Sequence, residues 1–261
     1  MPNKLLGQHF LRNPDVVKKI IAAIDTQKKE TIIEVGPGYG ELTWPLAEAC
    51  VAQGAHLIAI EKDQKLADEL RIMNREPGIE IIAGDVLKIL TSRLTSFNPA
   101  YKIIGNIPYY LTGHLLRIVS ELENHPSRCV FMVQKEVAMR MVAEVGGMNR
   151  LAASVRFWAD VKILTVVSKM DFSPSPKVDS AVIVLDKKQK PALADAEKYF
   201  TAVRAIFAQP RKTILNNLAS KKEELNKEQI VERLQDANID PNSRPQGLSV
   251  EKIAQIAEIF F

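Results

Sequence analysis

The sequence predicts an α/β protein, in which a doubly wound, mostly parallel sheet of seven strands is followed by a small all-helical domain. Short apolar runs alternate with amphipathic segments of helical period along residues 31–185, as in βαβ units. Polar side chains directly follow several of these runs, and parallel sheets bind ligands at the carboxyl ends of their strands. After residue 190 only the helical period continues.

The composition predicts a soluble, cytoplasmic protein. Of the 261 residues, 46% are hydrophobic and 25% are charged, which is typical of a chain that buries a core. Cys50 and Cys129 stand alone in the sequence, as reduced cysteines of a cytosolic protein do. No apolar run has the length of a membrane span, and the first residues lack the apolar core of a secretory signal. The net charge of +4 permits an anionic partner without requiring one.

The first predicted strand, residues 31–36, leads into a glycine turn, Gly36-Pro-Gly-Tyr-Gly40, and then into a helix from about Glu41 to Ala52. Glycines let backbone N–H groups approach a ligand closely at the positive end of a helix. The G-x-G-x-G spacing is neither the dinucleotide fingerprint nor a phosphate loop. On its own the turn fits a tight strand-to-helix connection equally well.

Acidic residues end the next two predicted strands. Residues 56–60 end at Glu61, and residues 79–84 end at Asp85. A carboxylate after the second strand is where a ribose diol is held in nucleotide-binding sheets. Each acid also suits the start of the helix that follows it, as a first-turn residue or an N-cap. Strand, glycine turn and acid together favour the nucleotide site.

The fourth predicted strand, residues 101–104, ends in the sequence Gly105-Asn-Ile-Pro-Tyr-Tyr110. The Asn106 side chain offers an acceptor oxygen, Pro108 restricts the turn, and Tyr109 offers a ring face for stacking. These three groups predict a pocket for a flat base that forms hydrogen bonds. The alternative is a strand-to-helix turn with two core tyrosines.

The other elements complete the sheet. An arm over residues 4–14 precedes a helix that ends near Ile24. A fifth strand over residues 129–133 is followed by helices to about residue 143 and over residues 150–158, and then by strands over residues 161–167 and 178–185. The loop of residues 171–177 is extended and carries Phe172 beside prolines. Phe172 is either a hydrophobic plug or a second stacking surface.

A charged hinge over residues 187–190, closed by Pro191, separates the two expected domains, residues 1–188 and 189–261. The second domain has a helical pattern, and Arg211 and Lys212 stand near the start of one helix. Composition alone fits an ordinary solvated helical face there.

Six segments in this order resemble the ribosomal RNA adenine dimethyltransferases, and most closely their bacterial small-subunit (16S) branch. The segments are Gly7–Leu11, Glu34–Thr43, Gly105–Tyr109, Gln134–Val137, Phe172–Ser180 and Arg211–Thr213. The resemblance covers almost the whole chain. It implies a Rossmann-like, S-adenosylmethionine-dependent methyltransferase that dimethylates N6 of two adjacent adenines near the 3′ end of 16S rRNA during ribosome biogenesis.

The resemblance also implies a role for individual residues. S-adenosylmethionine is the expected methyl donor, with no metal. The residues expected to bind the donor are His9, Leu11, Gly36, Gly38, Glu61, Lys62, Asp85, Val86 and Asn106. In the pocket for the target adenine, the Asn106 side chain and the Pro108 carbonyl would hold the amine, and Tyr109 and Phe172 would stack on the base.

For RNA, the resemblance implies contacts from Lys177, Arg211 and Lys212, and the assembling 30S subunit as the partner of a monomeric, cytoplasmic enzyme without membrane attachment. His9 stands where many relatives carry Asn, and Pro210 where relatives often carry Arg. Two alternatives remain: the related large-subunit rRNA methyltransferases that confer macrolide resistance, and an RNA-binding assembly factor without catalysis.

Overall fold

The computed structural model describes residues 9–74, 76, 78–93, 100–189, 195–222 and 224–261. The chain forms two compact units: Met1–Ala138 with Val161–Lys187, and Met139–Asp160 with Lys188–Phe261. The division into domains at residue 188, as residues 1–188 and 189–261, remains a prediction. The two compact units do not coincide with these domains, because residues 139–160 belong to the second unit. Residues 190 and 191 of the predicted hinge and residues 4–8 of the predicted arm lie outside the described residues.

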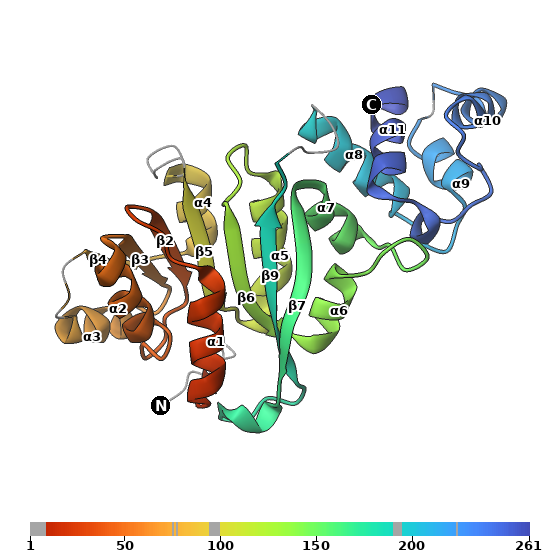
Figure 1. The fold of residues 1–261 in the computed structure, drawn as a ribbon. Helices are drawn as coiled ribbons and strands as arrows, with labels where there is room; N and C mark the ends of the chain where they lie inside the picture. The colour runs from red at the N-terminus through yellow and green to blue at the C-terminus, as the bar shows by residue number, and fades with distance from the viewer. Residues whose placement is uncertain (1–8, 75, 77, 94–99, 190–194, 223) are drawn as a thin grey trace. The chain divides into compact units, whose positions relative to one another are not determined.

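The first unit is built on a seven-stranded sheet with the order β4-β3-β2-β5-β6-β9-β7, which confirms the predicted fold class (Figure 1). The strands are β2 (Thr31–Val35), β3 (His56–Glu61), β4 (Ile79–Ala83), β5 (Tyr101–Asn106), β6 (Arg128–Gln134), β7 (Ala159–Val167) and β9 (Ser180–Lys187). The strands β4, β3, β2, β5 and β6 pair in parallel, and β9 pairs antiparallel with β6. All five residues of β2 are buried, as expected for a central strand covered on both faces.

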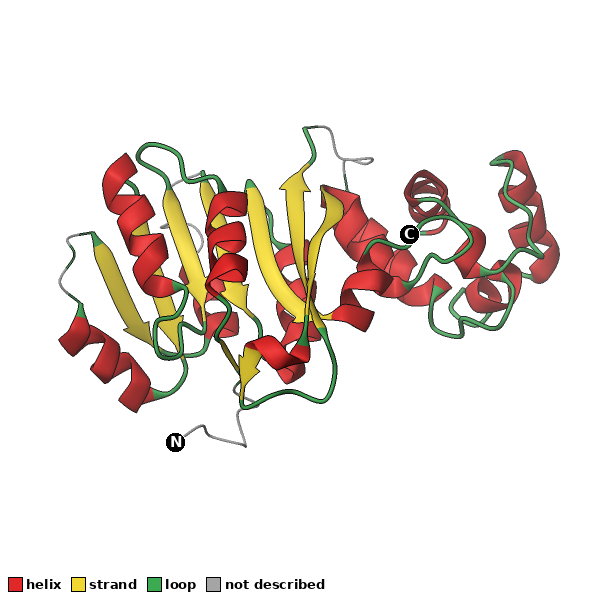
Figure 2. Cartoon of the chain, turned by 60° about the horizontal axis from the view of Figure 1, so that its bottom comes forward, coloured by secondary structure: helices red, strands yellow, loops and turns green. Residues whose placement is uncertain are grey.

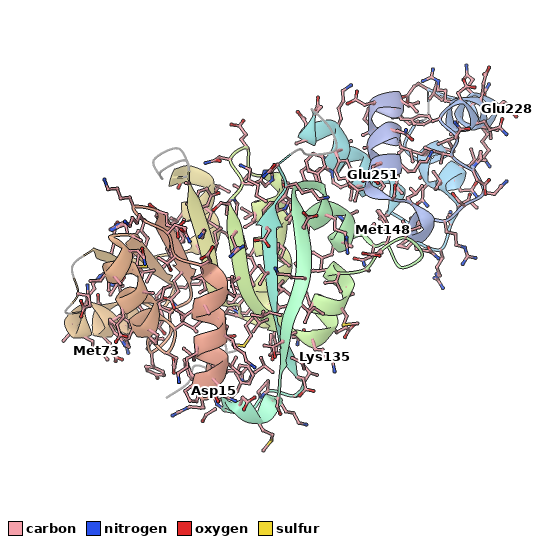
Figure 3. The ribbon with its side chains drawn as sticks, in the orientation of Figure 1. Asp15, Met73, Lys135, Met148, Glu228 and Glu251 are labelled. Atoms are coloured by element: carbon pink, nitrogen blue, oxygen red, sulfur yellow. The ribbon has the colours of Figure 1, made fainter. Side chains whose placement is uncertain are left out.

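Helices cover both faces of the sheet (Figure 2). The helices that follow or precede its strands are α1 (Pro14–Ile24), α2 (Thr43–Gln53), α3 (Gln64–Met73), α4 (Val86–Arg93), α5 (Tyr109–Glu121) and α6 (Lys135–Met141). α1 and α2 pack together on one face, while α4 and α5 pack together on the other. This arrangement places the carboxyl ends of the strands at one edge, where α5 and α6 begin. Asp15 at the start of α1 and Lys135 at the start of α6 are labelled at this edge in Figure 3.

Helix α1 shows how the local sequence sets an element. Asn13 caps it by accepting hydrogen bonds from the N–H groups of Asp15 and Val16, and Pro14 suits the first helical position. Val16, Ile20 and Ile24 recur at helical spacing and are buried. The predicted helix and the observed one therefore coincide.

A second, two-stranded sheet was not predicted. β1 (Phe10–Leu11) pairs antiparallel with β8 (Phe172–Ser173), so that Leu11 lies opposite Phe172 and Phe10 opposite Ser173. Leu11 and Phe172 are both buried in the main hydrophobic core. Two-residue strands carry almost no periodic pattern, so only the fold reveals the pairing.

The second unit is helical. It contains α7 (Arg150–Trp158), α8 (Ala196–Ile206), α9 (Ile214–Ala219), α10 (Lys227–Asp236) and α11 (Val250–Phe260). At its centre the ring of Phe157 stacks on Tyr199, with centroids 4.3 Å apart, and the Tyr199 hydroxyl donates to the Ala153 carbonyl at 3.0 Å. These contacts join α7 to α8, which explains why residues before β7 belong to this unit.

Candidate active site

An open cavity lies in the first unit at the carboxyl edge of the sheet. It brings together all twelve residues that the sequence assigned to the donor and to the target adenine. They are His9, Leu11, Gly36, Gly38, Glu61, Lys62, Asp85, Val86, Asn106, Pro108, Tyr109 and Phe172. The lining also includes residues that the sequence pattern did not indicate, among them Phe10, Glu34, Ile107 and Tyr110.

The glycine turn follows β2 and forms one wall of this cavity. Gly36 and Gly38 have φ angles of +66° and +61°, which glycine adopts readily and other residues rarely do. A Cβ at Gly38 would lie 3.0 Å from the ring of Phe10, so a side chain there would be crowded as well as strained. The Gly36 N–H donates to the Ile60 carbonyl at 3.0 Å, which fixes the turn against the end of β3.

Glu61 ends β3 and is only 5% exposed. Its Oε2 accepts the Gly38 N–H at 3.1 Å and its Oε1 accepts the Asp63 N–H at 2.9 Å. Burial raises the pKa of the Glu61 carboxyl, whereas the backbone N–H groups of Asp63 and Gly38 lower it. Each carboxylate oxygen has about two acceptor positions, so both can still accept a ligand hydroxyl.

Glu34 is a buried carboxyl that lines the cavity beside Glu61. Burial raises its pKa to about 8, and the neighbouring carboxylates of Glu61 and Glu41 contribute to this increase. Within the described residues, no hydrogen-bond donor reaches Glu34 Oε2. The sequence could have indicated this residue, because an acid inside an otherwise apolar strand is unusual.

Asp85 follows β4 and has two roles in the structure. Its Oδ1 accepts the Leu87 N–H at 3.0 Å, as a helix cap does, and its Oδ2 lies 3.7 Å from Lys62 Nζ. Val86 is buried next to it and lines the cavity. The capping role and a ligand role are therefore compatible.

Asn106 ends β5, in register with Met132 of β6. Its Nδ2 donates to the His9 carbonyl at 2.9 Å, which within the described residues is the one hydrogen bond of this side chain. The amide oxygen is therefore left as an acceptor beside the cavity. Gly105 lets the strand pass close to β2, because a Cβ there would lie 2.6 Å from the Val35 carbonyl oxygen.

The Pro108 carbonyl is already used by helix α5. It accepts the N–H groups of Leu111 at 2.9 Å and Thr112 at 3.2 Å, and also the Thr112 hydroxyl at 3.2 Å. A carbonyl oxygen has two lone pairs, so it has no capacity left for a substrate amine. The preceding carbonyl, of Ile107, is not reached by any donor among the described residues, while the Ile107 N–H donates to the Met132 carbonyl.

Aromatic side chains from several elements line the same cavity. The rings of His9 and Tyr109 have centroids 5.8 Å apart, and the Tyr109 hydroxyl lies 3.4 Å from Ser180 Oγ. Phe172 is only 6% exposed and belongs to the hydrophobic core, yet it also lines the cavity. Its place in the core fits a hydrophobic plug, and its role as a stacking surface remains a prediction. Tyr110 is 50% exposed and also lines the cavity.

The predicted RNA contacts lie elsewhere. Lys177 is exposed on the loop that follows β8, whereas Arg211 and Lys212 are exposed in the second unit. Asn217 is buried and organises their turn by bonding to both backbone groups of Gln209. In the described part of the chain, no cluster of three or more metal-ligating side chains occurs. No helix there has the length and hydropathy needed to cross a membrane.

Solved structures share this fold. A dimethyladenosine transferase from Plasmodium falciparum superposes with a TM-score of 0.77 at 24% identity, over 95% of each chain. The 23S rRNA methyltransferase ErmE superposes with a TM-score of 0.72 at 24% identity, over 96% of this chain and 99% of its own. These superpositions show that the chain has the fold of both proteins.

Sequence relatives identify the family. Residues 2–261 match the ribosomal RNA adenine dimethylase family. The ribosomal RNA small subunit methyltransferase A of Dehalococcoides mccartyi strain 195 is 37% identical over 98% of this chain and 88% of its own. The protein of the same name from Mycoplasma capricolum is 35% identical over 99% and 97%. The chain belongs to the ribosomal RNA adenine dimethylase family.

Proposed function

We propose that this chain dimethylates N6 of two adjacent adenines near the 3′ end of small-subunit (16S) rRNA, with S-adenosylmethionine as methyl donor. One observation carries the proposal most directly. The acceptor oxygen of Asn106 and the buried carboxylate of Glu61 line the same cavity, so a nucleotide donor and an adenine amine can be held together in a member of this family.

The residues of the donor half fit S-adenosylmethionine. The oxygens of Glu61 retain acceptor capacity for the ribose hydroxyls, and the Asp85 carboxylate can accept from an adenine amine while Val86 packs beside that ring. Gly36 and Gly38 would approach the methionine part, and His9 and Leu11 would border the donor site. Lys62, which faces Asp85, would lie beside the adenine. S-adenosylmethionine supplies an electrophilic methyl group, and we expect no metal to be required.

The target half would hold the adenine amine and direct its lone pair. The lone pair of N6 is delocalised into the ring, so the amine needs acceptors for its protons that turn the lone pair out of the plane. Asn106 Oδ1 is one such acceptor. For the second acceptor we propose the Ile107 carbonyl in place of the Pro108 carbonyl, whose lone pairs already accept hydrogen bonds from α5. Both acceptors would stabilise the positive charge that develops on nitrogen. No general base with a shifted pKa is required, because orientation supplies most of the acceleration.

The base must leave its stack to reach these acceptors, and Tyr109 and Phe172 would replace its stacking partners. Stacking on an aromatic side chain contributes about 1–3 kcal/mol. A monomethylated amine has only one proton left, so the second transfer needs only one of the two acceptors.

The second unit, with Arg211 and Lys212, would bind rRNA in the assembling 30S subunit, and Lys177 would add a phosphate contact. Cations that neutralise phosphates make binding dependent on salt. Neutralising both Arg211 and Lys212 should therefore weaken binding to the subunit and flatten its salt dependence, with donor affinity unchanged. We expect a monomeric enzyme of the cytoplasm, with a domain boundary near residue 188.

The deciding experiment incubates the protein with labelled S-adenosylmethionine and 30S subunits that lack the two methylated adenines. We expect two methyl groups on each of two adjacent adenines, and no incorporation into fully methylated 30S subunits. Large-subunit RNA serves as the second substrate, because label there would favour the large-subunit activity. Binding to 30S subunits without any transfer would favour an assembly factor.

A further inference from the structure

A short segment, His9–Asn13, connects the two halves of the cavity; we call it the strap. Its first residue lines the cavity and its carbonyl accepts the hydrogen bond from Asn106 Nδ2. A carbonyl can only accept, so this contact decides which end of the Asn106 amide faces the cavity. With the amide turned around, Nδ2 would face the substrate, and an N–H group cannot accept an amine proton.

The strap is held against the loop of residues 171–174 along its length. Phe10 and Leu11 pair with Ser173 and Phe172, and the Arg12 N–H donates to the Asp171 carbonyl at 2.7 Å. The His9 ring contributes Nδ1, which lies 2.8 Å from the Pro174 carbonyl oxygen and must donate to it. These contacts hold the strap beside the loop through backbone groups and the His9 ring.

At the far end of the strap, Asn13 Nδ2 donates to Asp171 Oδ1 at 3.0 Å. Within the described residues this is the one hydrogen bond that joins side chains of the strap and the loop. The Oδ1 of the same amide caps α1 through the N–H groups of Asp15 and Val16. Asn13 therefore uses both ends of its amide, one for the helix and one for the loop.

We propose that Asn13 and Asp171 are positioning residues for methyl transfer: their hydrogen bond sets the register of the strap, so that the His9 carbonyl holds Asn106 with its oxygen toward the target amine. The inference rests on the proposed function. Asn13 and Asp171 are themselves absent from the cavity lining, so their effect must travel through the strap.

The two roles of Asn13 can be separated by substitution. Asn13→Asp retains a side-chain oxygen, and Asp caps helices about as well as Asn. It loses the donor to Asp171 and places two carboxylates against each other. Asp171→Asn is the matched control, because its amide oxygen still accepts from Asn13. In the double variant Asn13→Asp/Asp171→Asn, the amide at position 171 donates to the carboxylate at position 13, so the hydrogen bond returns with its direction reversed.

The test measures single-turnover methylation of under-methylated 30S subunits at saturating S-adenosylmethionine, with thermal unfolding of each variant. We expect Asn13→Asp to slow transfer about tenfold or more, because it loses roughly one hydrogen bond, and to lower the midpoint of unfolding by only a few degrees. Asp171→Asn should keep a near-normal rate, and the double variant should regain most of the loss. A normal rate in Asn13→Asp, or a double variant as slow as Asn13→Asp, would overturn the inference.

A second readout does not depend on activity. The side-chain amide resonances of Asn106, assigned by their absence in Asn106→Ala, report its bond to His9 through slow hydrogen exchange. We expect slow exchange in the wild type and the double variant, and fast exchange in Asn13→Asp. Slow exchange in all three proteins would refute the positioning role, whether or not the wild type methylates adenine. A wild type that methylates no adenine would refute only the proposed function.

Discussion

The two halves of the cavity are assembled in different ways. In the donor half, the contacts join neighbouring βα units: the Gly38 N–H reaches Glu61, 23 positions along the chain, and Lys62 faces Asp85. In the target half, Asn106 reaches back to His9, 97 positions away, and His9 contacts Pro174 across 165 positions. The donor half is therefore local in sequence, and the target half depends on the whole first unit.

This difference extends to chemistry. The Glu61 carboxylate in the donor half is already held by two backbone N–H groups, so its geometry is set before a ligand arrives. In the target half, Asn106 is held through its donor end while its acceptor end stays available among the described residues. We infer that the donor half contributes affinity for the methyl donor and that Asn106 in the target half contributes rate, and substitutions in each half can test this separation.

The largest effect is expected from Asn106→Ala. Removing one preorganised polar group from a site of this kind costs about 10²–10³ in rate, because the amine lone pair is no longer directed. Single-turnover methylation measures this loss, and calorimetry should show nearly unchanged donor affinity. If Asn106 served only the turn, the variant would lose roughly 1 kcal/mol of stability and keep its rate.

Glu61→Ala should weaken S-adenosylmethionine binding by about 10- to 150-fold. A hydrogen bond to a charged group contributes about 1.5–3 kcal/mol, and the carboxylate is placed to accept from the ribose. Calorimetric titration with S-adenosylmethionine measures the change, and circular dichroism controls for folding. Unchanged affinity would remove Glu61 from the donor site.

Tyr109→Ala should raise the KM for the RNA substrate by about 5- to 150-fold, the equivalent of stacking on one base. Tyr109→Phe keeps the ring and should be mild, because the hydroxyl makes only a long contact of 3.4 Å with Ser180. Steady-state kinetics on 30S subunits compare the two variants. Equal defects in both would assign the role to the hydroxyl and not to the ring face.

The smallest effect on transfer is expected from Glu34→Gln, because burial raises the pKa of Glu34 to about 8 and keeps the carboxyl protonated at neutral pH. Since this pKa lies above that of the unfolded chain, the folded state binds the extra proton, and Glu34 lowers stability progressively as pH rises from about 4.5 to 8. Replacing it with glutamine should remove up to about 1.4 kcal/mol per pH unit of that slope. Denaturant unfolding between pH 5 and pH 8 measures it, and equal slopes in both proteins would contradict the assignment.

The same contrast explains what the sequence could predict. Gly36, Glu61 and Asp85 each directly follow their own apolar strand, so strand pattern and turn chemistry placed them at one edge without knowledge of the fold. The strap could not be found in this way, since Phe10 and Leu11 pair with residues 172–173. No local pattern encodes a pairing between residues so far apart in the sequence. The choice between the Ile107 and Pro108 carbonyls also needed coordinates, because it depends on which backbone groups α5 already uses.

The separation of binding from rate is tested most directly by single-turnover methylation of under-methylated 30S subunits across a range of S-adenosylmethionine concentrations, with Glu61→Ala and Asn106→Ala side by side. We expect Glu61→Ala to approach the wild-type plateau at higher donor concentrations. Asn106→Ala should reach half-saturation at the wild-type concentration, on a plateau about 10²–10³ lower. A wild-type plateau for Asn106→Ala, or a plateau for Glu61→Ala that falls equally far, would contradict the division of the cavity into a binding half and a rate half.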